Sequence, residues 1–431
     1  MTNKIFPIKT ETACLSKWNW STIFFNSGTS ASCHRTQKYP IDPNNFSNFH
    51  NLPEKVSARK IMLDGQWPGA GCEYCKNVEE HHGISARKSD LNQLQNILLI
   101  PPELHDDPAE TSVTPTILEV YFANTCNMAC VYCGPHFSSK WEDENQRFNG
   151  EFEFKPDVGP YSVQRAQHNM HYESMVAEFW QWLAQDDHYK TIQRYHVLGG
   201  EPFLLKELDA SIDFWEQHGN PDLVFSVITN LNIPHTRFVR YIKKFERLVL
   251  SNKIWKLQLT ASLDCWGPEQ EYVRWGLDLA LWQKNFEFLL NQPWIEISIN
   301  SAISALTVKQ LPALIEKING WNQGQTKVAG RWKSEPILYS FNTTGGVTTI
   351  YNFGSNLFAQ DFERVLELMP SNTNAQQDQL QCMQGIANTL ANSQLNVLGI
   401  EQLKQYLTQL DFRRNTCWQD QFSWLDQDFS I

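Results

Sequence analysis

The chain lacks a long apolar run. No stretch approaches the ~18 uninterrupted apolar residues of a membrane span, and the first residues, MTNKIFPIKTETACLSKW, hold no apolar run of signal-peptide length. We therefore expect a cytoplasmic protein without a membrane partner.

Charge is scarce, and positive charge is in deficit. Charged residues make up 19% and hydrophobic residues 42% of the 431 residues, which excludes a disordered chain and favours a packed core. The 36 Lys and Arg residues are outnumbered by 47 Asp and Glu, so the net charge of −11 offers no overall attraction for nucleic acid. We interpret the basic segment RYIKKFER (240–247) as a solvated helix face, with a local nucleic-acid patch as the alternative.

The ten cysteines lack the even spacing of a disulfide framework, and seven of them lie in the first third of the chain. In a reducing compartment, clustered cysteines bind metal or take part in chemistry more often than they form bridges. Metal binding is therefore the leading interpretation. The cysteines are Cys14, Cys33, Cys72, Cys75, Cys126, Cys130, Cys133, Cys265, Cys382 and Cys417.

The pattern along the chain divides it into three parts. Residues 1–112 are irregular and rich in turns, which suits a loop-dominated region organised by something other than a large sheet. Residues 113–345 alternate short β-branched runs with segments of helical period. Residues 346–431 are interpreted as a C-terminal extension with two helical segments, DFERVLELM (361–369) and GIEQLKQYLTQL (399–410). The predicted fold is α/β, a partial (β/α)6 barrel of the TIM type. Its six strand-like runs are 117–124, 195–200, 224–231, 255–264, 295–303 and 336–342.

The sharpest motif is CNMACVYC, directly after the first predicted strand. Its Cys126, Cys130 and Cys133 could hold a 4Fe-4S cluster and leave one iron without a protein ligand. The carboxyl end of a barrel strand is also where barrel active sites form. The alternatives are a zinc site completed by His136, or three unrelated buried thiols.

A second motif ends the next predicted strand: Gly199, Gly200, Glu201 and Pro202. Together with the three cysteines and Tyr132, it resembles the signature of the radical S-adenosylmethionine (radical SAM) superfamily, over about residues 113–345. The resemblance implies that the amine and carboxylate of SAM chelate the open iron, that the GGEP backbone contacts the amine, and that Tyr132 lies near the adenine. Glycines permit close approach to a ligand, and Glu201 would add negative charge near the sulfonium.

Later strand ends supply further candidate SAM contacts. Asn and Ser at such positions are also common turn caps, and Arg274 could either bind the cofactor carboxylate through two hydrogen bonds or be an exposed helix residue. These candidates are Thr229, Asn230, Ser262, Asp264, Arg274 and Asn300.

Cys14, Cys33, Cys72 and Cys75 form a complete set of four ligands. They suit a structural zinc or a fully ligated iron-sulfur cluster, with His81 and His82 as alternative ligands. The surrounding sequence, including GCEYCKNVEEHHGISARK, resembles a twitch-type radical SAM subgroup, related to SPASM proteins, whose extra cysteines are N-terminal. The resemblance implies an auxiliary iron-sulfur cluster.

Three cysteines remain. Cys265 follows the fourth predicted strand, at the expected catalytic mouth, while Cys382 and Cys417 lie in the C-terminal extension. A thiol near a substrate radical can donate a hydrogen atom, so Cys265 and Cys417 are candidate catalytic residues. The alternative for all three is a buried, small apolar residue.

The sequence thus predicts a radical SAM enzyme. The resemblance implies reductive cleavage of SAM, hydrogen abstraction from a substrate, and a donor of flavodoxin or ferredoxin type. The resemblance to twitch-bearing members implies a peptide substrate, epimerised or cross-linked during maturation. The alternatives are a radical SAM enzyme acting on a small metabolite or nucleoside, and a non-catalytic zinc scaffold.

Overall fold

The computed structural model describes residues 7–33, 35–69, 71–80, 85, 87–88, 100–148, 168–324 and 336–429. It contains a nine-stranded sheet in the order β3-β2-β1-β4-β5-β6-β7-β8-β9. All neighbouring strands pair in parallel except β1 with β2 and β2 with β3. The strands are β1 (Trp20–Phe24), β2 (Thr29–Ala31), β3 (Tyr39–Pro40), β4 (Ile117–Tyr121), β5 (Arg194–Leu198), β6 (Asn220–Thr229), β7 (Ile254–Ser262), β8 (Ile295–Ile303) and β9 (Leu338–Thr343).

The six strands predicted for the core are β4 to β9, and they lie side by side in chain order, as consecutive parallel βα units should. The α/β class is confirmed. The barrel is not: the strand order has two ends, β3 and β9, so the described sheet is open. Closure into a partial barrel stays a prediction.

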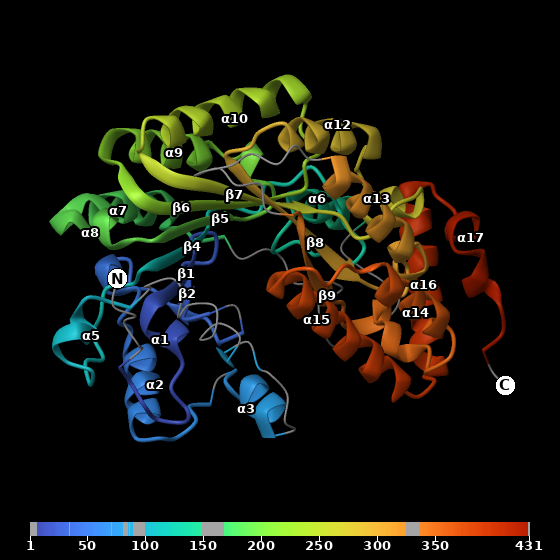
Figure 1. Cartoon of the computed structure of the whole chain (residues 1–431), viewed down its shortest axis with the longest axis horizontal. Helices are drawn as coiled ribbons and strands as arrows, with labels where there is room; N and C mark the ends of the chain where they lie inside the picture. Colours follow the sequence, from blue (N-terminus) through green and yellow to red (C-terminus); the bar gives the residue numbers. More distant parts are fainter. Residues whose placement is uncertain are drawn as a thin grey trace.

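The helices group around this sheet (Figure 1). Helices α9, α10 and α12 run along one side, α1 and α2 lie near β1 and β2, and α14 to α16 lie near β9. No described helix is long and apolar enough to cross a bilayer. The helices are α1 (Leu15–Asn19), α2 (Pro53–Leu63), α3 (Glu73–Glu80), α5 (Glu103–Asp106), α6 (Ser139–Arg147), α7 (Tyr172–Ala184), α8 (His188–Thr191), α9 (Lys206–His218), α10 (His235–Leu250), α11 (Glu269–Val273), α12 (Leu279–Leu290), α13 (Leu311–Gly324), α14 (Ala359–Leu368), α15 (Asn374–Ala391), α16 (Val397–Arg414) and α17 (Trp418–Gln421).

Alternation along the strands gives the sheet one apolar and one polar face. Side chains of a strand point to opposite faces in turn. On the apolar face Tyr195 of β5 meets Ser211 of α9 at 3.0 Å, and Phe225 of β6 packs against Phe245 of α10 with ring centroids 4.9 Å apart. Most of the molecule's core therefore lies between this face and its helices.

The N-terminal region differs from the prediction. Its β1 pairs in parallel with β4, from Trp20 opposite Ile117 to Phe24 opposite Tyr121, and it brings β2 and β3 into the same sheet. The expectation of a region organised apart from a large sheet is therefore wrong. Long-range pairing of one short strand is invisible to local periodicity, which explains the error. The boundary at residue 112 stays a prediction.

The C-terminal extension is helical, as expected. The two predicted helical segments correspond to α14 and α16, and a further long helix, α15, lies between them. The basic segment 240–247 lies on α10, whose buried side chains recur every three or four residues. Arg240, Lys243 and Arg247 are exposed on the opposite side, in agreement with a solvated helix face.

Candidate functional site

The three-cysteine loop, residues 126–133, follows the carboxyl end of β4 and is fixed by backbone hydrogen bonds. Ala129 N donates to Trp275 O at 2.9 Å, and Val131 N donates to Val273 O at 2.7 Å. Within the loop, Cys133 N donates to Cys130 O at 2.9 Å. The last residue of α11 and the segment after it therefore hold the middle of the loop.

Side chains from α6 and α16 hold the outer side of the loop. Trp141 Nε1 donates to Cys130 O at 2.8 Å, and Tyr406 Oη donates to Val131 O at 2.7 Å. Arg414 Nη2 donates to Ala129 O at 3.0 Å. Sequence reasoning missed all three residues. Tyr406 and Arg414 contact the loop across 275 and 285 residues, and a contact at that separation leaves no local signal.

Arg414 is itself fixed by a buried ion pair. Its Nε lies 3.1 Å from Glu144 Oε2, and both side chains are 3% exposed. The guanidinium also lies over the Trp141 ring, 4.8 Å from the centroid. The last turn of α16, the middle of α6 and the cysteine loop thus form one packed unit.

The three thiols lie close enough to affect one another's ionisation. Burial, followed by the charge of Cys130, raises the pKa of Cys126 to about 12. Burial and the charges of Cys130 and Cys126 raise the pKa of Cys133 well above its usual value. Three clustered, shielded thiols are a donor set suited to iron, which would bind them as thiolates.

The two glycines of the second motif bring β5 against the chain that leads into the loop. A Cβ on Gly200 would lie 2.3 Å from Thr125 O, and one on Gly199 would lie 2.7 Å from Ala123 O. Gly200 N donates to Ala123 O at 3.1 Å. The close approach seen here is to backbone, so the expected contact with a ligand stays a prediction.

Glu201 is fully buried, and both carboxylate oxygens accept hydrogen bonds from the chain. Oε1 accepts from Thr229 Oγ1 at 2.8 Å and from Phe203 N at 3.1 Å, while Oε2 accepts from Asn230 N at 2.7 Å. Burial raises its pKa to about 7 despite these bonds. Glu201 therefore ties the end of β5 to the end of β6, and Pro202 begins a short 3-10 turn there.

Tyr132 of the three-cysteine loop forms a hydrogen-bonded network with Asp264 and Arg274, just beyond the end of β7. Tyr132 Oη donates to Asp264 Oδ2 at 2.6 Å, and Arg274 Nε and Nη2 donate to the two Asp264 oxygens at 2.8 Å each. Arg274 is 7% exposed, so the alternative of an exposed helix residue is wrong. Its two-pronged contact is with an internal carboxylate, and a role toward the cofactor stays a prediction.

Ser262, the last residue of β7, lies opposite Asn300 of β8. Asn300 Oδ1 accepts from Asn342 Nδ2 of β9 at 3.0 Å. Thr229 uses its hydroxyl to bind Glu201, and Asn230 lies beside the loop, with Nδ2 3.9 Å from Cys126 Sγ. The structure thus brings Asn230 to the cysteines and gives Thr229 a positioning contact.

The four N-terminal cysteines lie around a common space in the structure. Cys14, Cys33, Cys72 and Cys75 all line one cavity. Burial and the charge of Cys33 raise the pKa of Cys14 to about 12, and burial also raises that of Cys72. Because this four-cysteine site draws on three separate stretches of the N-terminal region, a bound metal would join them. His81 and His82 lie outside the described residues.

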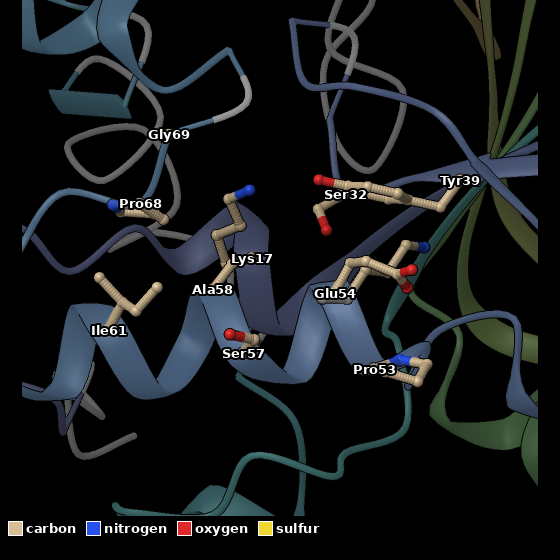
Figure 2. A pocket seen from close by; sticks show the side chains of 11 residues that line it. Lys17, Ser32, Tyr39, Pro53, Glu54, Ser57, Ala58, Ile61, Pro68 and Gly69 are labelled. Carbon is tan, nitrogen blue, oxygen red and sulfur yellow. The ribbon is translucent and has the colours of Figure 1, made fainter.

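A second cavity, of about 420 Å³, opens beside the four-cysteine site. Lys17 and Ser32 line both cavities. Figure 2 shows the Lys17 side chain rising from α1 between Ser32 and Pro68, above the α2 residues that form the cavity floor. Lys17 is only 6% exposed, so its ammonium brings positive charge to the wall of the thiol cavity.

Further buried cations lie nearby. Lys55 Nζ donates to Ser30 Oγ at 2.6 Å and to Phe49 O at 2.9 Å, and the charges of Arg59 and Lys17 help burial to lower its pKa. Arg59 Nε donates to Lys17 O at 2.7 Å. Burial lowers the pKa of Arg59 to about 9, against the charges of Glu103 and Glu110. This positive group would offset the negative charge of a thiolate-bound cluster.

The remaining cysteines differ in exposure. Cys265 is fully buried, and its Sγ lies 3.3 Å from Gln270 Oε1. Cys382 and Cys417 are exposed, so the alternative of a buried apolar residue is wrong for both. Cys417 precedes α17, and its Sγ lies 3.4 Å from Gln419 Oε1.

Among the residues that the structure describes, no three His, Cys, Asp or Glu side chains take the arrangement of a ready-made metal site. The ligand roles of both cysteine groups, and the zinc site with His136, therefore stay predictions.

Comparison with known proteins adds little. No protein-family model and no curated protein matches the chain. One similar solved structure is described as native anSMEcpe with bound AdoMet and Kp18Cys peptide, at 15% identity and a TM-score of 0.32. The match covers 58% of this chain and 57% of the other, so this chain spans less than two thirds of that protein. A likeness this weak carries no argument.

Proposed function

We propose that the chain is a radical SAM enzyme. The observation that carries the proposal is the meeting of the two motifs: Gly200 and Glu201 donate to Ala123 O and Thr125 O, in the segment that enters the three-cysteine loop. Motifs about 65 residues apart in the chain thus form one structural unit at the carboxyl edge of a parallel sheet, where α/β enzymes place their active sites.

Cys126, Cys130 and Cys133 would hold a 4Fe-4S cluster with one open iron. Bound there, the group would supply one-electron reduction of SAM, the chemistry that would yield methionine and a 5′-deoxyadenosyl radical able to take a hydrogen atom from the substrate. The GGEP backbone is proposed to contact the methionyl amine, and Tyr132 to lie near the adenine. Thr229, Ser262, Arg274 and Asn300 are proposed to line the same cofactor site.

The chain's own contribution is a rigid site. Arg414, Tyr406 and Trp141 fix the loop carbonyls, so the thiols have little freedom to move apart. Asp264 orients Tyr132 and Arg274 together. Such preorganisation lets the protein position a reactive group while the cofactor supplies the difficult chemistry.

The four-cysteine site is proposed to hold an auxiliary iron-sulfur cluster. We also propose that the chain has three domains, at residues 1–112, 113–345 and 346–431. The cavity lined by four thiols and the buried cations beside it support the cluster. A flavodoxin or ferredoxin type protein is proposed as the electron donor. We propose a peptide substrate, epimerised or cross-linked in the cytoplasm, with Cys265 or Cys417 as hydrogen donor. Cys417 is reachable from solvent, whereas Cys265 is closed off.

Metal analysis tests this proposal. Anaerobically reconstituted wild-type protein is compared with one variant in which all three loop cysteines are Ala, and with another in which all four N-terminal cysteines are Ala. We expect about eight irons in the wild type and about four in each variant. Cys382→Ala, an exposed thiol outside both groups, is the control and should keep all the iron.

About four irons and one zinc, with the zinc lost from the N-terminal variant, would make that site structural and leave the enzyme standing. Zinc without iron would contradict the proposal and support a non-catalytic scaffold.

A further inference from the structure

The polar face of the sheet carries a row of six side chains in register. Each is paired across neighbouring strands with the next, from β1 through β4, β5, β6 and β7 to β8. We call these residues the polar row: Thr22, Glu119, His196, Ser226, Gln258 and Glu296. Because each comes from a different strand of a hydrogen-bonded sheet, their positions are fixed by the backbone.

One end of the row is electrically balanced. Lys256 Nζ pairs with Glu296, Gln258 Nε2 also donates to Glu296, and Ser226 Oγ donates to Gln258 Oε1 at 3.4 Å. The negative charge of Glu296 therefore has a cation of the chain beside it.

Glu119, at the other end, is different. Its Oε2 accepts from Thr22 Oγ1 at 2.6 Å, and its side chain is only 8% exposed. Among the described residues, its one ion-pair contact within 4.0 Å is His196, whose Nδ1 lies 3.8 Å from Oε1. Burial raises the pKa of Glu119, as expected for a carboxylate that lacks a cation.

His196 does not supply that cation. Burial, helped by the charge of Arg194 on the same face, lowers its pKa to about 3, so the imidazole is neutral at physiological pH. Its Nε2 is buried and has no hydrogen-bond partner among the described residues. A buried polar atom without a partner requires an explanation, and a ligand that the structure does not contain is one.

The position of this pair connects it to the three-cysteine loop. Tyr121 follows Glu119 by two residues, on the same face of β4 and about 7 Å further along the strand. Burial and then the charges of Glu119 and Cys133 raise the pKa of Tyr121. Tyr121 is therefore close enough to interact electrostatically with both Glu119 and the three-cysteine loop. A group held at Glu119 would lie on the face that leads to the proposed cofactor.

We propose that Glu119 and His196 bind a primary ammonium group of the substrate. The group's positive charge would neutralise the Glu119 carboxylate, and its three N–H donors could also serve the imidazole nitrogen. This inference rests on the proposed function, because it assigns a substrate class to the proposed radical SAM enzyme. The ammonium could belong to a lysine side chain in a peptide or to a free alkylamine.

Binding of small probes tests the site directly. Nα-acetyl-lysine amide, the norleucine and glutamate counterparts and cadaverine are titrated into reconstituted holoenzyme, with saturation-transfer NMR as the readout. We expect the lysine probe to bind at least tenfold more tightly than either counterpart. Glu119→Gln, which keeps the shape but removes the charge, should weaken that binding at least tenfold.

The matched control is Glu296→Gln, which changes a carboxylate of the same polar row that forms an ion pair with Lys256. It should alter binding by less than twofold. Tighter binding of the lysine amide than of cadaverine would indicate a peptide source, and the reverse order would indicate a free amine; both support the site. Equal binding of the norleucine probe, equal binding by Glu119→Gln, or no binding of either amine would overturn the proposal.

The same samples separate this inference from the proposed function. Iron content and 5′-deoxyadenosine formation report on the three-cysteine loop, whereas probe binding reports on Glu119. Charge-dependent binding by a protein without iron would refute the radical SAM proposal and keep the ammonium site. A protein with its full iron content that forms 5′-deoxyadenosine but binds the probes regardless of their charge would keep the radical SAM proposal and refute the ammonium site.

Discussion

At the scale of residues, Glu201 shows how a motif can be structural and functional at once. Its carboxylate accepts hydrogen bonds from Thr229, Asn230 and Phe203, so Glu201 joins two strand ends near the proposed SAM site. The negative charge that the sequence suggested for a sulfonium is instead shared with three donors of the chain. Neither the burial nor these partners can be read from four letters of sequence.

Glu201 should also make stability depend on pH. Its pKa rises from 4.5 to about 7 on folding, so in this window the folded protein keeps a proton that the unfolded chain releases. Stability should therefore fall as pH rises from 4.5 to 7, by up to about 3 kcal/mol from this group. Glu201→Gln should remove this contribution to the pH dependence. Denaturant unfolding of wild type and variant between pH 4.5 and 7 measures the difference in their free energies of unfolding. Parallel stability curves would refute it.

At the scale of elements, α16 acts as a brace for the cysteine loop. Tyr406 and Arg414, two turns apart on one helix, donate to the loop carbonyls of Val131 and Ala129. The sequence predicted this helix correctly but not its partner. Local periodicity shows which face of a helix is apolar, whereas docking depends on distant residues such as Glu144.

Removing Arg414 should loosen the loop. Arg414→Met leaves Glu144 buried without its closest cation, which should lower the free energy of unfolding by about 3–5 kcal/mol. Tyr406→Phe removes one hydrogen bond and should cost about 1 kcal/mol. In holoenzyme, iron release to a chelator should be fastest in Arg414→Met.

The control for that series is Arg364→Met, which breaks an ion pair with Glu316 whose two side chains are each about half exposed. Exposed pairs contribute little, so stability and iron release should stay near wild type. If Arg414→Met behaved like this control, α16 would not be a brace.

At the scale of the whole molecule, the N-terminal and C-terminal regions both contact the part of the chain that holds β4 and the three-cysteine loop. The N-terminal region adds β1 beside β4, and the C-terminal region adds α16 beside the cysteine loop. The six core strands and their order could be predicted, because βα alternation and the rules for parallel sheets constrain them strongly. The pairing of Trp20 with Ile117 could not, because nothing local specifies a partner so far along the chain.

The candidate site was predictable to a similar extent. Cysteine spacing predicted two thiol groups, whose ligand roles stay predictions, and in the structure Cys14, Cys33, Cys72 and Cys75 line one cavity. The sequence did not reveal the Glu119 and His196 pair, because one Glu and one His in separate strands form no motif. Their pairing depends on the register between β4 and β5.

The most direct test of the central claim is formation of 5′-deoxyadenosine. Reconstituted wild-type protein and the loop variant with all three cysteines changed to Ala are incubated without oxygen with SAM and dithionite, and the nucleoside is quantified by chromatography. The account predicts the nucleoside from wild type and none above background from the variant. Equal amounts from both, or none from an iron-loaded wild type, would contradict it.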